Sequence, residues 1–549
     1  MKTFDHNKYR PAPSVPITNR QWPNQRIEKA PVWASVDLRD GNQALIEPMN
    51  VAQKRKMWAL LLKLGLKHIE VGFPAASQAD FAFVRWLIEE DQIPDDVQVQ
   101  VLVQAREALI KKTFDALKGA KKAIVHVYNS TSKLQRERVF ALDRDGITHI
   151  AVCGAQWVQR EAAKYSQTEW QFQYSPESFS TTEMDYAVEI CEAVLDVWQP
   201  TPEQPCIINL PATVEASTAN LFADQVEYFC THISRRESII VSLHTHNDRG
   251  CAVAAAELGL MAGADRLEGT LLGNGERTGN MDMVTLAMNL YSQGIDPELD
   301  LSCPDEIIRV TTECTNIAVN PRHPWVGELV YTAFSGSHQD AIRKCLRQQR
   351  ADEPWQVAYL PIDPKDIGRD YQAIIRVNSQ SGKGGVAFVL ERDYGLSLPR
   401  WMQTEMAELV QQVSETRGGV IDSETIYQIF MNHFVQDQTP VMLNGYSLNN
   451  EGSRDVVELR IDIEGVAQKI EGKGEGVIAA FINAWSHHSG QQINVVNYNE
   501  HATDEGSSAK AITYIQLDLE GTLVSGAALD YDTVKASLKA VISALNRDL

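Results

Sequence analysis

Two histidines at the end of an apolar run could hold a divalent metal ion. The run Val241-Ser242-Leu243 leads into His244-Thr245-His246 and then into a polar turn. Side chains alternate between the two faces of a β-strand, so His244 and His246 are expected on one face, about 6–7 Å apart along the backbone. That spacing suits two imidazole ligands of one metal ion. For an isolated His-x-His pair, two polar residues at a strand end would be the simpler interpretation.

Other parts of the chain offer ligands that match these histidines. Asp40 follows the first apolar run and supplies a carboxylate, and Asn280 closes a glycine-rich loop and supplies a weaker amide oxygen. With His244 and His246 they leave positions for water or substrate, which is typical of a catalytic metal site. Mixed nitrogen and oxygen ligands accept zinc, manganese, magnesium or cobalt, so the pattern leaves the metal open.

Three further polar residues could act on a substrate. Arg39 lies next to Asp40, and we expect it to reach an oxygen that becomes negative in the reaction; the alternative is a salt bridge to a neighbouring loop. Glu177 and Thr213 could hydrogen-bond a bound substrate, although either alone could be a plain loop residue. The loop Gly273–Asn280 lacks the lysine and spacing of a phosphate-binding P-loop, so we do not expect nucleotide binding.

The elements around these residues predict a (β/α)8 TIM barrel over residues 31–325. Eight short β-rich runs alternate with helical patterns, which is the signature of this fold. The predicted strands are Val32–Leu38, His68–Val71, Val97–Val103, Ala123–Tyr128, Gln171–Tyr174, Cys206–Leu210, Ile239–His244 and Arg266–Leu272. A ninth run, His149–Cys153, is assigned to the stretch between the fourth and fifth strands because short apolar runs are ambiguous.

The polar residues gather where the predicted strands end. Clusters follow the first, fifth, sixth, seventh and eighth strands, and the opposite ends of the same strands carry no comparable cluster. Active sites in TIM barrels lie at the carboxyl ends of the strands. The clustering therefore favours one catalytic centre at this face of the barrel.

Composition excludes several classes of partner. The chain has 549 residues and a formal charge of −21, which argues against nucleic acid or an anionic membrane as a partner. No apolar run is long enough to span a bilayer. The eight cysteines are scattered without a Cys-x-x-Cys pair, as in reduced cytosolic proteins, so we expect a cytoplasmic protein. Residues 1–30 are predicted to be an N-terminal arm rather than a signal peptide.

The rest of the chain is predicted to form a linker and a C-terminal α+β domain. Residues 326–435 are interpreted as mixed linker subdomains, with helices at Arg400–Ser414 and Ser423–His433 and Asp422 as an N-cap. Residues 436–549 contain a weak duplication, in which Val457–Gly465 is similar to Tyr514–Gly521. Each copy is interpreted as a strand, a glycine turn, a second strand and a helix.

At these motifs the chain resembles the metal-dependent, acyl-CoA Claisen-condensing barrel enzymes, and among them the long type of 2-isopropylmalate synthase. The motifs are Asp37-Leu38-Arg39-Asp40-Gly41-Asn42-Gln43, His244-Thr245-His246-Asn247-Asp248-Arg249-Gly250, Gly273-Asn274-Gly275-Glu276-Arg277-Thr278-Gly279-Asn280 and Phe334-Ser335-Gly336-Ser337-His338-Gln339-Asp340. The match is strong to about Arg400 and looser beyond. Position 245 is Thr here, where relatives often carry Pro or Cys.

The resemblance implies a reaction and roles for its residues. Acetyl-CoA would add to the ketone of 2-oxoisovalerate, and thioester hydrolysis would give 2-isopropylmalate and CoA, the first committed step to leucine. A divalent metal (Mg²⁺, Mn²⁺ or Zn²⁺) would polarise the ketone, and K⁺ is a candidate activator. Arg39, Glu177, Thr213 and Asn209 would contact the keto acid. The alternative within the family is a homocitrate or citramalate synthase with a different keto acid.

The resemblance also implies a homodimer with feedback control. His338 and Tyr371 would reach the active site from the neighbouring subunit and transfer protons, with a capping or packing histidine as the alternative for His338. The C-terminal domain would bind leucine and inhibit the enzyme. Gly526-Ala527-Ala528 is a candidate for close approach to this ligand, and packing of a helix against a sheet is the alternative.

Overall fold

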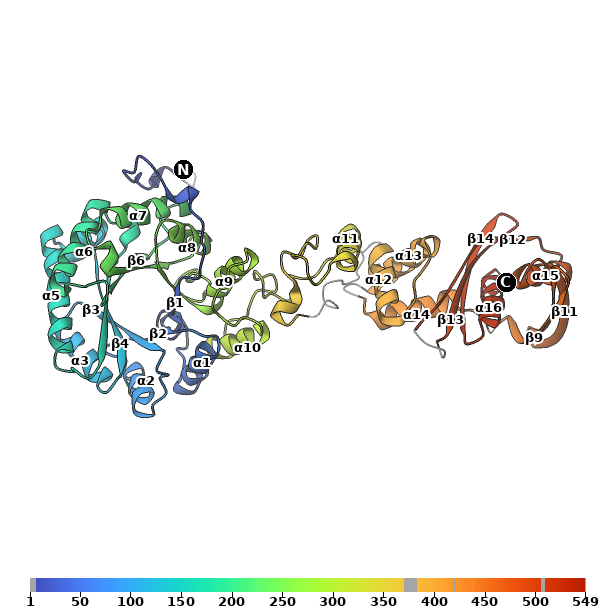
Figure 1. The fold of residues 1–549 in the computed structure, drawn as a ribbon, viewed down its shortest axis with the longest axis horizontal. Helices are drawn as coiled ribbons and strands as arrows, with labels where there is room; N and C mark the ends of the chain where they lie inside the picture. The colour runs from blue at the N-terminus through green and yellow to red at the C-terminus, as the bar shows by residue number, and fades with distance from the viewer. Residues whose placement is uncertain (1–5, 370–382, 418–420, 438, 505–508, 549) are drawn as a thin grey trace. The chain divides into compact units, whose positions relative to one another are not determined.

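The computed structural model describes residues 6–369, 383–417, 421–437, 439–504 and 509–548 (Figure 1). The chain divides into two compact units, Met1–Val330 and Tyr331–Leu549. Within the described ranges, no helix is both long and apolar enough to cross a membrane.

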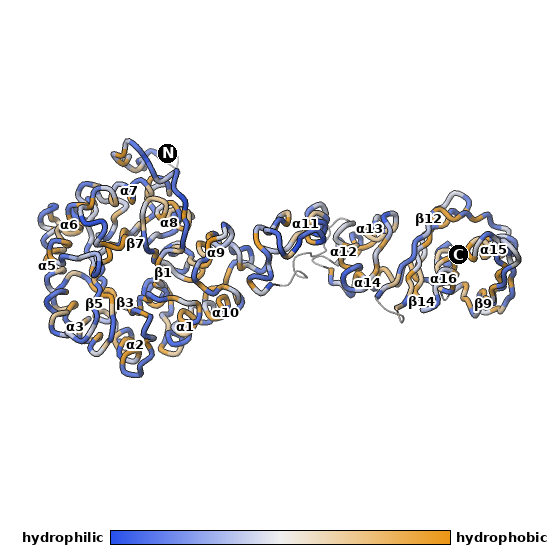
Figure 2. The backbone as a smooth tube through the Cα atoms, in the orientation of Figure 1, coloured by the Kyte–Doolittle hydropathy of each residue, from blue (hydrophilic) through white to orange (hydrophobic). Residues whose placement is uncertain are grey.

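The first unit is the predicted TIM barrel. Its eight strands pair in parallel and in chain order, and the first strand pairs with the eighth to close the barrel. The strands are β1 (Val32–Ser35), β2 (His68–Gly72), β3 (Gln98–Gln104), β4 (Lys122–Ser130), β5 (Glu169–Glu177), β6 (Cys206–Ala212), β7 (Ile239–Thr245) and β8 (Arg266–Gly269). Figure 2 shows the apolar character of strands such as β7, which is expected of strands enclosed by helices.

Helices surround this barrel. They are α1 (Val51–Lys63), α2 (Gln78–Glu89), α3 (Glu107–Leu117), α4 (Lys133–Gln135), α5 (Arg144–Ala162), α6 (Met184–Trp198), α7 (Ala219–His232), α8 (Ala252–Met261), α9 (Met283–Ser292) and α10 (Pro304–Thr315). The ambiguous run His149–Cys153 lies inside α5, so its assignment to the β4–β5 connection is confirmed. Its apolar residues form part of a helical face, a pattern that five residues are too few to reveal.

Two strands end earlier than the sequence predicted. The first was expected to reach Leu38, but β1 ends at Ser35 and a π-helical turn, η3, covers Asp37–Gly41. The eighth was expected to reach Leu272, but β8 ends at Gly269. The buried carboxylate of Asp37 accepts the backbone N–H of Leu271 at 3.0 Å and so ties the two ends together. A local apolar pattern does not show such a contact between segments far apart in the sequence.

The N-terminal arm lies on the barrel surface and is partly anchored there. Val15 and Trp22 are buried. Arg20 pairs with Asp224 of α7 at 2.6 Å, and the indole N–H of Trp22 donates to the same carboxylate at 2.9 Å. The arm is therefore held by an acidic side chain of the barrel's outer layer.

The second unit begins with helices and ends in an α+β domain. Its elements are α11 (Gly336–Gln348), α12 (Lys383–Tyr394), α13 (Arg400–Arg417), α14 (Ser423–Phe434), β9 (Val441–Glu451), β10 (Arg454–Ile463), β11 (Val466–Gly474), α15 (Val477–Ser489), β12 (Ile493–Ala502), β13 (Ala511–Leu519), β14 (Thr522–Asp530) and α16 (Thr533–Asn546). The two predicted helices correspond to α13 and α14, and Asp422 caps α14 by accepting the N–H of Thr425 at 2.7 Å.

The predicted duplication is present, with one more strand in each copy. The units are β9-β10-β11-α15 and β12-β13-β14-α16, and each sheet is antiparallel. The hairpin turns match: Asp462 accepts the N–H of Gly465, and Asp518 accepts the N–H of Gly521, both at 2.7 Å. Sequence reading missed β9 and β12. Both are rich in asparagine and contain register shifts, so their strand character depends on pairing with β10 and β13.

Equivalent glycines let each helix approach its sheet closely. A Cβ on Gly472 would lie 2.3 Å from the carbonyl oxygen of Ala480, and one on Gly526 would lie 2.5 Å from that of Ala540. Ala527 and Ala528 are buried, and they belong to the two apolar cores on opposite faces of the second sheet. Gly526, Ala527 and Ala528 are thus placed where they pack helices against the sheet, and contact with leucine stays a prediction for them.

Candidate metal centre and active site

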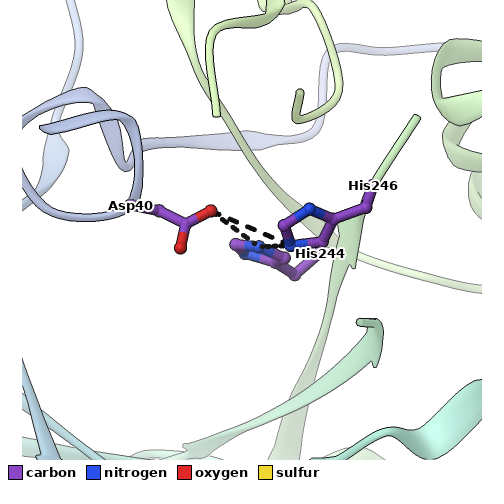
Figure 3. Close-up of side chains that lie close together, drawn as sticks. All are labelled: Asp40, His244 and His246. Carbon is purple, nitrogen blue, oxygen red and sulfur yellow. Dashed lines mark hydrogen bonds and ion pairs between the residues drawn. The ribbon is translucent and has the colours of Figure 1, made fainter. Parts of the chain in front are cut away.

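Three side chains with metal-binding atoms converge at the mouth of the barrel. The Nε2 atoms of His244 and His246 lie 3.6 and 3.8 Å from Oδ2 of Asp40 and 3.1 Å from one another (Figure 3). All three residues are buried. Oδ2 of Asp40 has no hydrogen-bond partner among the described residues. A buried carboxylate oxygen facing two imidazole nitrogens is a donor set that fits a divalent cation.

Local structure explains how these residues meet. His244 lies on β7 and His246 just beyond it, so the strand's alternation points both rings the same way, as the sequence predicted. Asp40 and Arg39 lie on the π-helical turn η3, where the N–H of Gly41 reaches the carbonyl of Val36. The turn removes the strand's alternation, and Arg39 bonds to Asp40 at 2.5 Å beside the two histidines.

The backbone of Asn280 pairs with that of His246, which places Asn280 next to the candidate metal centre. Residue 280 forms a β-bridge with His246, and its side-chain amide donates to the carbonyl of Asn274 at 3.1 Å. Oδ1 of Asn280 is buried, and the described part of the chain offers it no hydrogen-bond partner. Its role as a fourth ligand stays a prediction that this unsatisfied oxygen makes chemically reasonable.

The charges of these three side chains influence one another. Burial alone would lower the pKa of His244, but the nearby carboxylates of Asp40 and Glu268 raise it to about 9. Burial and the nearby His244 lower the pKa of His246 to about 3. Burial would raise the pKa of Asp40, but Arg39 and His244 hold it well below its usual range. One imidazolium therefore lies between a carboxylate and a neutral imidazole.

A buried network holds Arg39 from below. Its Nε donates to Glu70, which in turn bonds His126 Nδ1 at 2.8 Å. Nε2 of His126 lies 2.7 Å from the hydroxyl of Ser175. The guanidinium is therefore fixed by two carboxylates, Glu70 and Asp40, and a fixed cation stabilises developing negative charge better than a mobile one.

Glu268 on β8 is the functional residue that sequence reading missed most clearly. Its Oε2 bonds Nδ1 of His244 at 2.9 Å, so a carboxylate orients this imidazole from behind. Its Oε1 accepts from Gln100, Gln173 and Arg266 at 2.8–3.0 Å. The sequence does contain a signal for it, because Arg266 and Glu268 are charged residues in a short predicted strand. Such residues are rarely buried without a partner.

A cavity of about 250 Å³ opens above these groups. Glu177 and Thr213 line it: Glu177 accepts from Ser130, and the hydroxyl of Thr213 accepts the N–H of Ser178 at 2.9 Å. Asn209 also lines it and donates to Ser175 at 3.0 Å. The cavity is also lined by residues to which the sequence alone assigned no individual role: Gln43, Leu102, His126, Tyr128, Ser175, Pro211, Glu276 and Arg277.

The two residues expected from the neighbouring subunit lie outside the barrel unit. His338 is near the start of α11, and its ring stacks on Tyr359 with centroids 3.9 Å apart. Tyr371 lies outside the described residues. The roles of both stay predictions.

Family models cover most of the chain. Residues 30–310 match the HMGL-like model, residues 328–391 the alpha-isopropylmalate synthase post-catalytic domain-like model, and residues 420–549 the LeuA allosteric (dimerisation) domain. These matches follow the barrel, the helical segment and the duplicated domain in order.

The similarity to known proteins extends over nearly the full length of this chain. The chain is 54% identical over 548 residues to a 2-isopropylmalate synthase of Alcanivorax borkumensis, covering 99% of this chain and 98% of that one. It is 52% identical to one of Pseudomonas savastanoi pv. phaseolicola, with 99% and 97% coverage. An HMG-CoA lyase structure from Acinetobacter baumannii aligns with 53% of this chain and 92% of its own, at 17% identity and a TM-score of 0.42.

Metal binding to this centre should release about one proton near neutral pH. His244, with a pKa of about 9, carries a proton that a metal must displace, whereas His246, with a pKa of about 3, is already neutral. Calorimetric titration of the full chain with Mn²⁺ in two buffers of different ionisation enthalpy measures the number of protons released. Binding without proton release would contradict the assigned charge states.

Proposed function

The chain belongs to the 2-isopropylmalate synthase family, and we propose how its own residues condense acetyl-CoA with 2-oxoisovalerate. The products are 2-isopropylmalate and CoA, formed by a Claisen condensation and hydrolysis of the thioester, in the first committed step of leucine biosynthesis. The observation that carries the proposal is the position of Arg39 beside Asp40, His244 and His246 in one cavity.

The metal-dependent chemistry of the family fits this donor set. Asp40, His244 and His246 would hold a divalent cation, with Asn280 as a fourth oxygen donor. A bound cation supplies Lewis-acid polarisation of the ketone. Mg²⁺, Mn²⁺ and Zn²⁺ are all compatible with these ligands, and K⁺ is a further candidate activator.

Arg39 would stabilise the negative charge that develops on the ketone oxygen. Glu70 and Asp40 fix its guanidinium, and it borders the cavity beside the two histidines. The remaining guanidinium N–H groups can donate to that oxygen without reorganising, which is the condition for strong electrostatic stabilisation.

The cavity has polar and apolar sides that suit a branched 2-keto acid. The hydroxyl of Thr213 accepts from Ser178, so its own hydrogen can donate to a substrate carboxylate. Glu177 and Asn209 supply further polar contacts. Leu102 and Pro211 line the same cavity and offer apolar surface to an isopropyl group.

Proton transfer from the methyl group of acetyl-CoA is assigned to His338, with Tyr371 as its partner. Neither residue belongs to the barrel unit, and the C-terminal segment matches a dimerisation domain. Donation of these residues by the second subunit of a homodimer would make the active site depend on assembly.

Leucine is the proposed inhibitor, and the C-terminal domain offers a cavity of suitable kind. A hollow of about 370 Å³ lies between the first turns of α15 and α16 and is lined by Gly476, Ser537 and Glu500. Backbone N–H groups at the start of α15, which no side chain caps, can bind a carboxylate, and Glu500 can bind an ammonium group. This hollow suits an amino acid better than Gly526, whose surroundings are occupied by α16.

Thiol release from acetyl-CoA should depend on metal and prefer 2-oxoisovalerate over pyruvate and 2-oxoglutarate. Chelation should abolish it, and Arg39→Gln should lower kcat roughly 10²–10³-fold because one charge-stabilising donor is lost. Arg236→Gln is the matched control, since Arg236 pairs with Asp265 at the start of β7. Release with another keto acid instead would show that 2-oxoisovalerate is not the substrate. No release from folded, metal-loaded protein would refute the proposal.

Two inactive variants should restore activity when mixed. In dimers formed from equal amounts of Arg39→Gln and His338→Ala chains, each hybrid retains one intact site, so about a quarter of wild-type activity is expected. The measurement is thiol release after co-refolding or subunit exchange. If both variants fold and dimerise but the mixture stays inactive, His338 does not act across the interface.

Leucine should bind the full chain with measurable heat, and Glu500→Gln should weaken it about tenfold or more through loss of a charged hydrogen bond. Glu458→Gln is the control, because Glu458 forms a surface ion pair with Lys469 on β10 and β11. Absence of heat with the wild-type chain, or equal weakening by both variants, would contradict leucine binding in this hollow.

A further inference from the structure

The Nδ1 atoms of His244 and His246, the two imidazoles of the candidate metal centre, have different surroundings. Nδ1 of His244 bonds directly to the carboxylate of Glu268 at 2.9 Å. Nδ1 of His246 is buried as well, but it has no hydrogen-bond partner in the described part of the chain. A neutral imidazole that presents Nε2 to a metal carries its hydrogen on Nδ1, and a buried N–H without an acceptor is costly. His246 therefore needs an acceptor that a direct protein contact does not provide.

A small cavity is lined by His246, by residues 215–218 of the loop after β6, and by residues of α7 and α8. Its volume is about 10 Å³, which is about the space that one water molecule requires. Glu215, Ser180 and Thr218 line it together with His246. Water occupies small buried cavities of this size where two or more polar groups can bond to it.

Glu215 brings an unsatisfied acceptor to the same cavity. Its side chain is buried, and Oε2 accepts the backbone N–H groups of Arg249 and Cys251 in the loop after β7. Oε1 is buried and, among the described residues, has no hydrogen-bond partner. The backbone N–H of Glu215 donates to Asp248 at 2.9 Å, so both ends of this residue are fixed.

We propose that one water in this cavity accepts the Nδ1–H of His246 and donates to Oε1 of Glu215, which makes Glu215 a positioning residue of the metal centre. Both orphaned atoms are satisfied by this arrangement. It also gives His246 the same kind of carboxylate support that His244 receives directly from Glu268. Because the hydrogen is then held on Nδ1, the Nε2 lone pair of His246 is directed toward Asp40 and the cation.

The proposal rests on the metal centre of the proposed function, but it concerns metal affinity rather than the substrate. In Glu215→Gln the amide oxygen can still accept the loop N–H groups. The amide NH₂ is only a donor, so it cannot accept the hydrogen that the water donates. A defect in this variant would therefore report the link to His246 more than the loop.

Glu227 provides a matched control. It is a buried carboxylate whose Oε1 accepts the backbone N–H groups of Gln21 and Trp22, and its Oε2 is also without a partner in the described chain. It belongs to α7 and lines no part of the active-site cavity or the small cavity. Glu227→Gln thus repeats the chemical change without changing the support of His246.

The test is the affinity of the full-length, metal-free chain for Mn²⁺ alone, followed by the paramagnetic resonance of free Mn²⁺. Glu215→Gln should bind about tenfold more weakly than wild type, the effect of losing a partner that orients a metal ligand. Glu227→Gln should bind like wild type, and His244→Ala should lose the site. If wild type binds Mn²⁺ and Glu215→Gln binds it equally well, the proposal is wrong while the proposed enzyme function stands. If His244→Ala binds like wild type, the metal centre itself is misassigned.

A crystal structure of the wild-type chain at high resolution tests the same inference without any substitution. It should contain a water within hydrogen-bond distance of both Nδ1 of His246 and Oε1 of Glu215. A direct bond between the two side chains, or a dry cavity, would overturn the proposal even if the Glu215→Gln protein fails to fold.

Discussion

The hydrogen bond between Glu268 and His244 links the inside of the barrel to the chemistry at its mouth. A buried carboxylate is costly unless donors surround it, and Arg266, Gln100 and Gln173 all donate to the other oxygen of Glu268. These three donors compensate the negative charge on Oε1 of Glu268, while Oε2 bonds His244. The orientation of one imidazole of the candidate metal centre thus depends on side chains from three strands, β3, β5 and β8.

Side chains inside the barrel also fix the position of Arg39 at its mouth. Arg39 is held by Glu70, which is bonded in turn to His126, so the guanidinium rests on a buried chain of partners rather than on a solvated loop. Rigid strands supply the positions, and short turns at their ends supply the reactive groups. The π-helical turn after β1 is the clearest case, because it places Arg39 and Asp40 on the same side, which a continued strand would not do.

The C-terminal domain is organised by a repeated contact of small residues. In each copy a glycine of the last strand faces an alanine of the following helix, Gly472 against Ala480 and Gly526 against Ala540. The close approach leaves the two helix starts beside a shared hollow. The glycines that make the close contacts and the residues that line the hollow are thus different parts of the same domain.

The sequence by itself determined the barrel, the duplicated domain and the set of candidate metal ligands, because strand periodicity and residue spacing are local. His244 and His246 had to share a face, and Asp40 supplied a carboxylate at the end of another strand. Only the tertiary structure decided the strand ends and the missed strands β9 and β12. It also decided the contacts that Glu268, Glu70 and Glu215 make. Each depends on partners far away in the chain: Asp37, just beyond β1, accepts the backbone N–H of Leu271, and Glu268 bonds a histidine of the neighbouring strand. A buried charge in a sequence shows that a partner is needed, and only the folded chain shows which one.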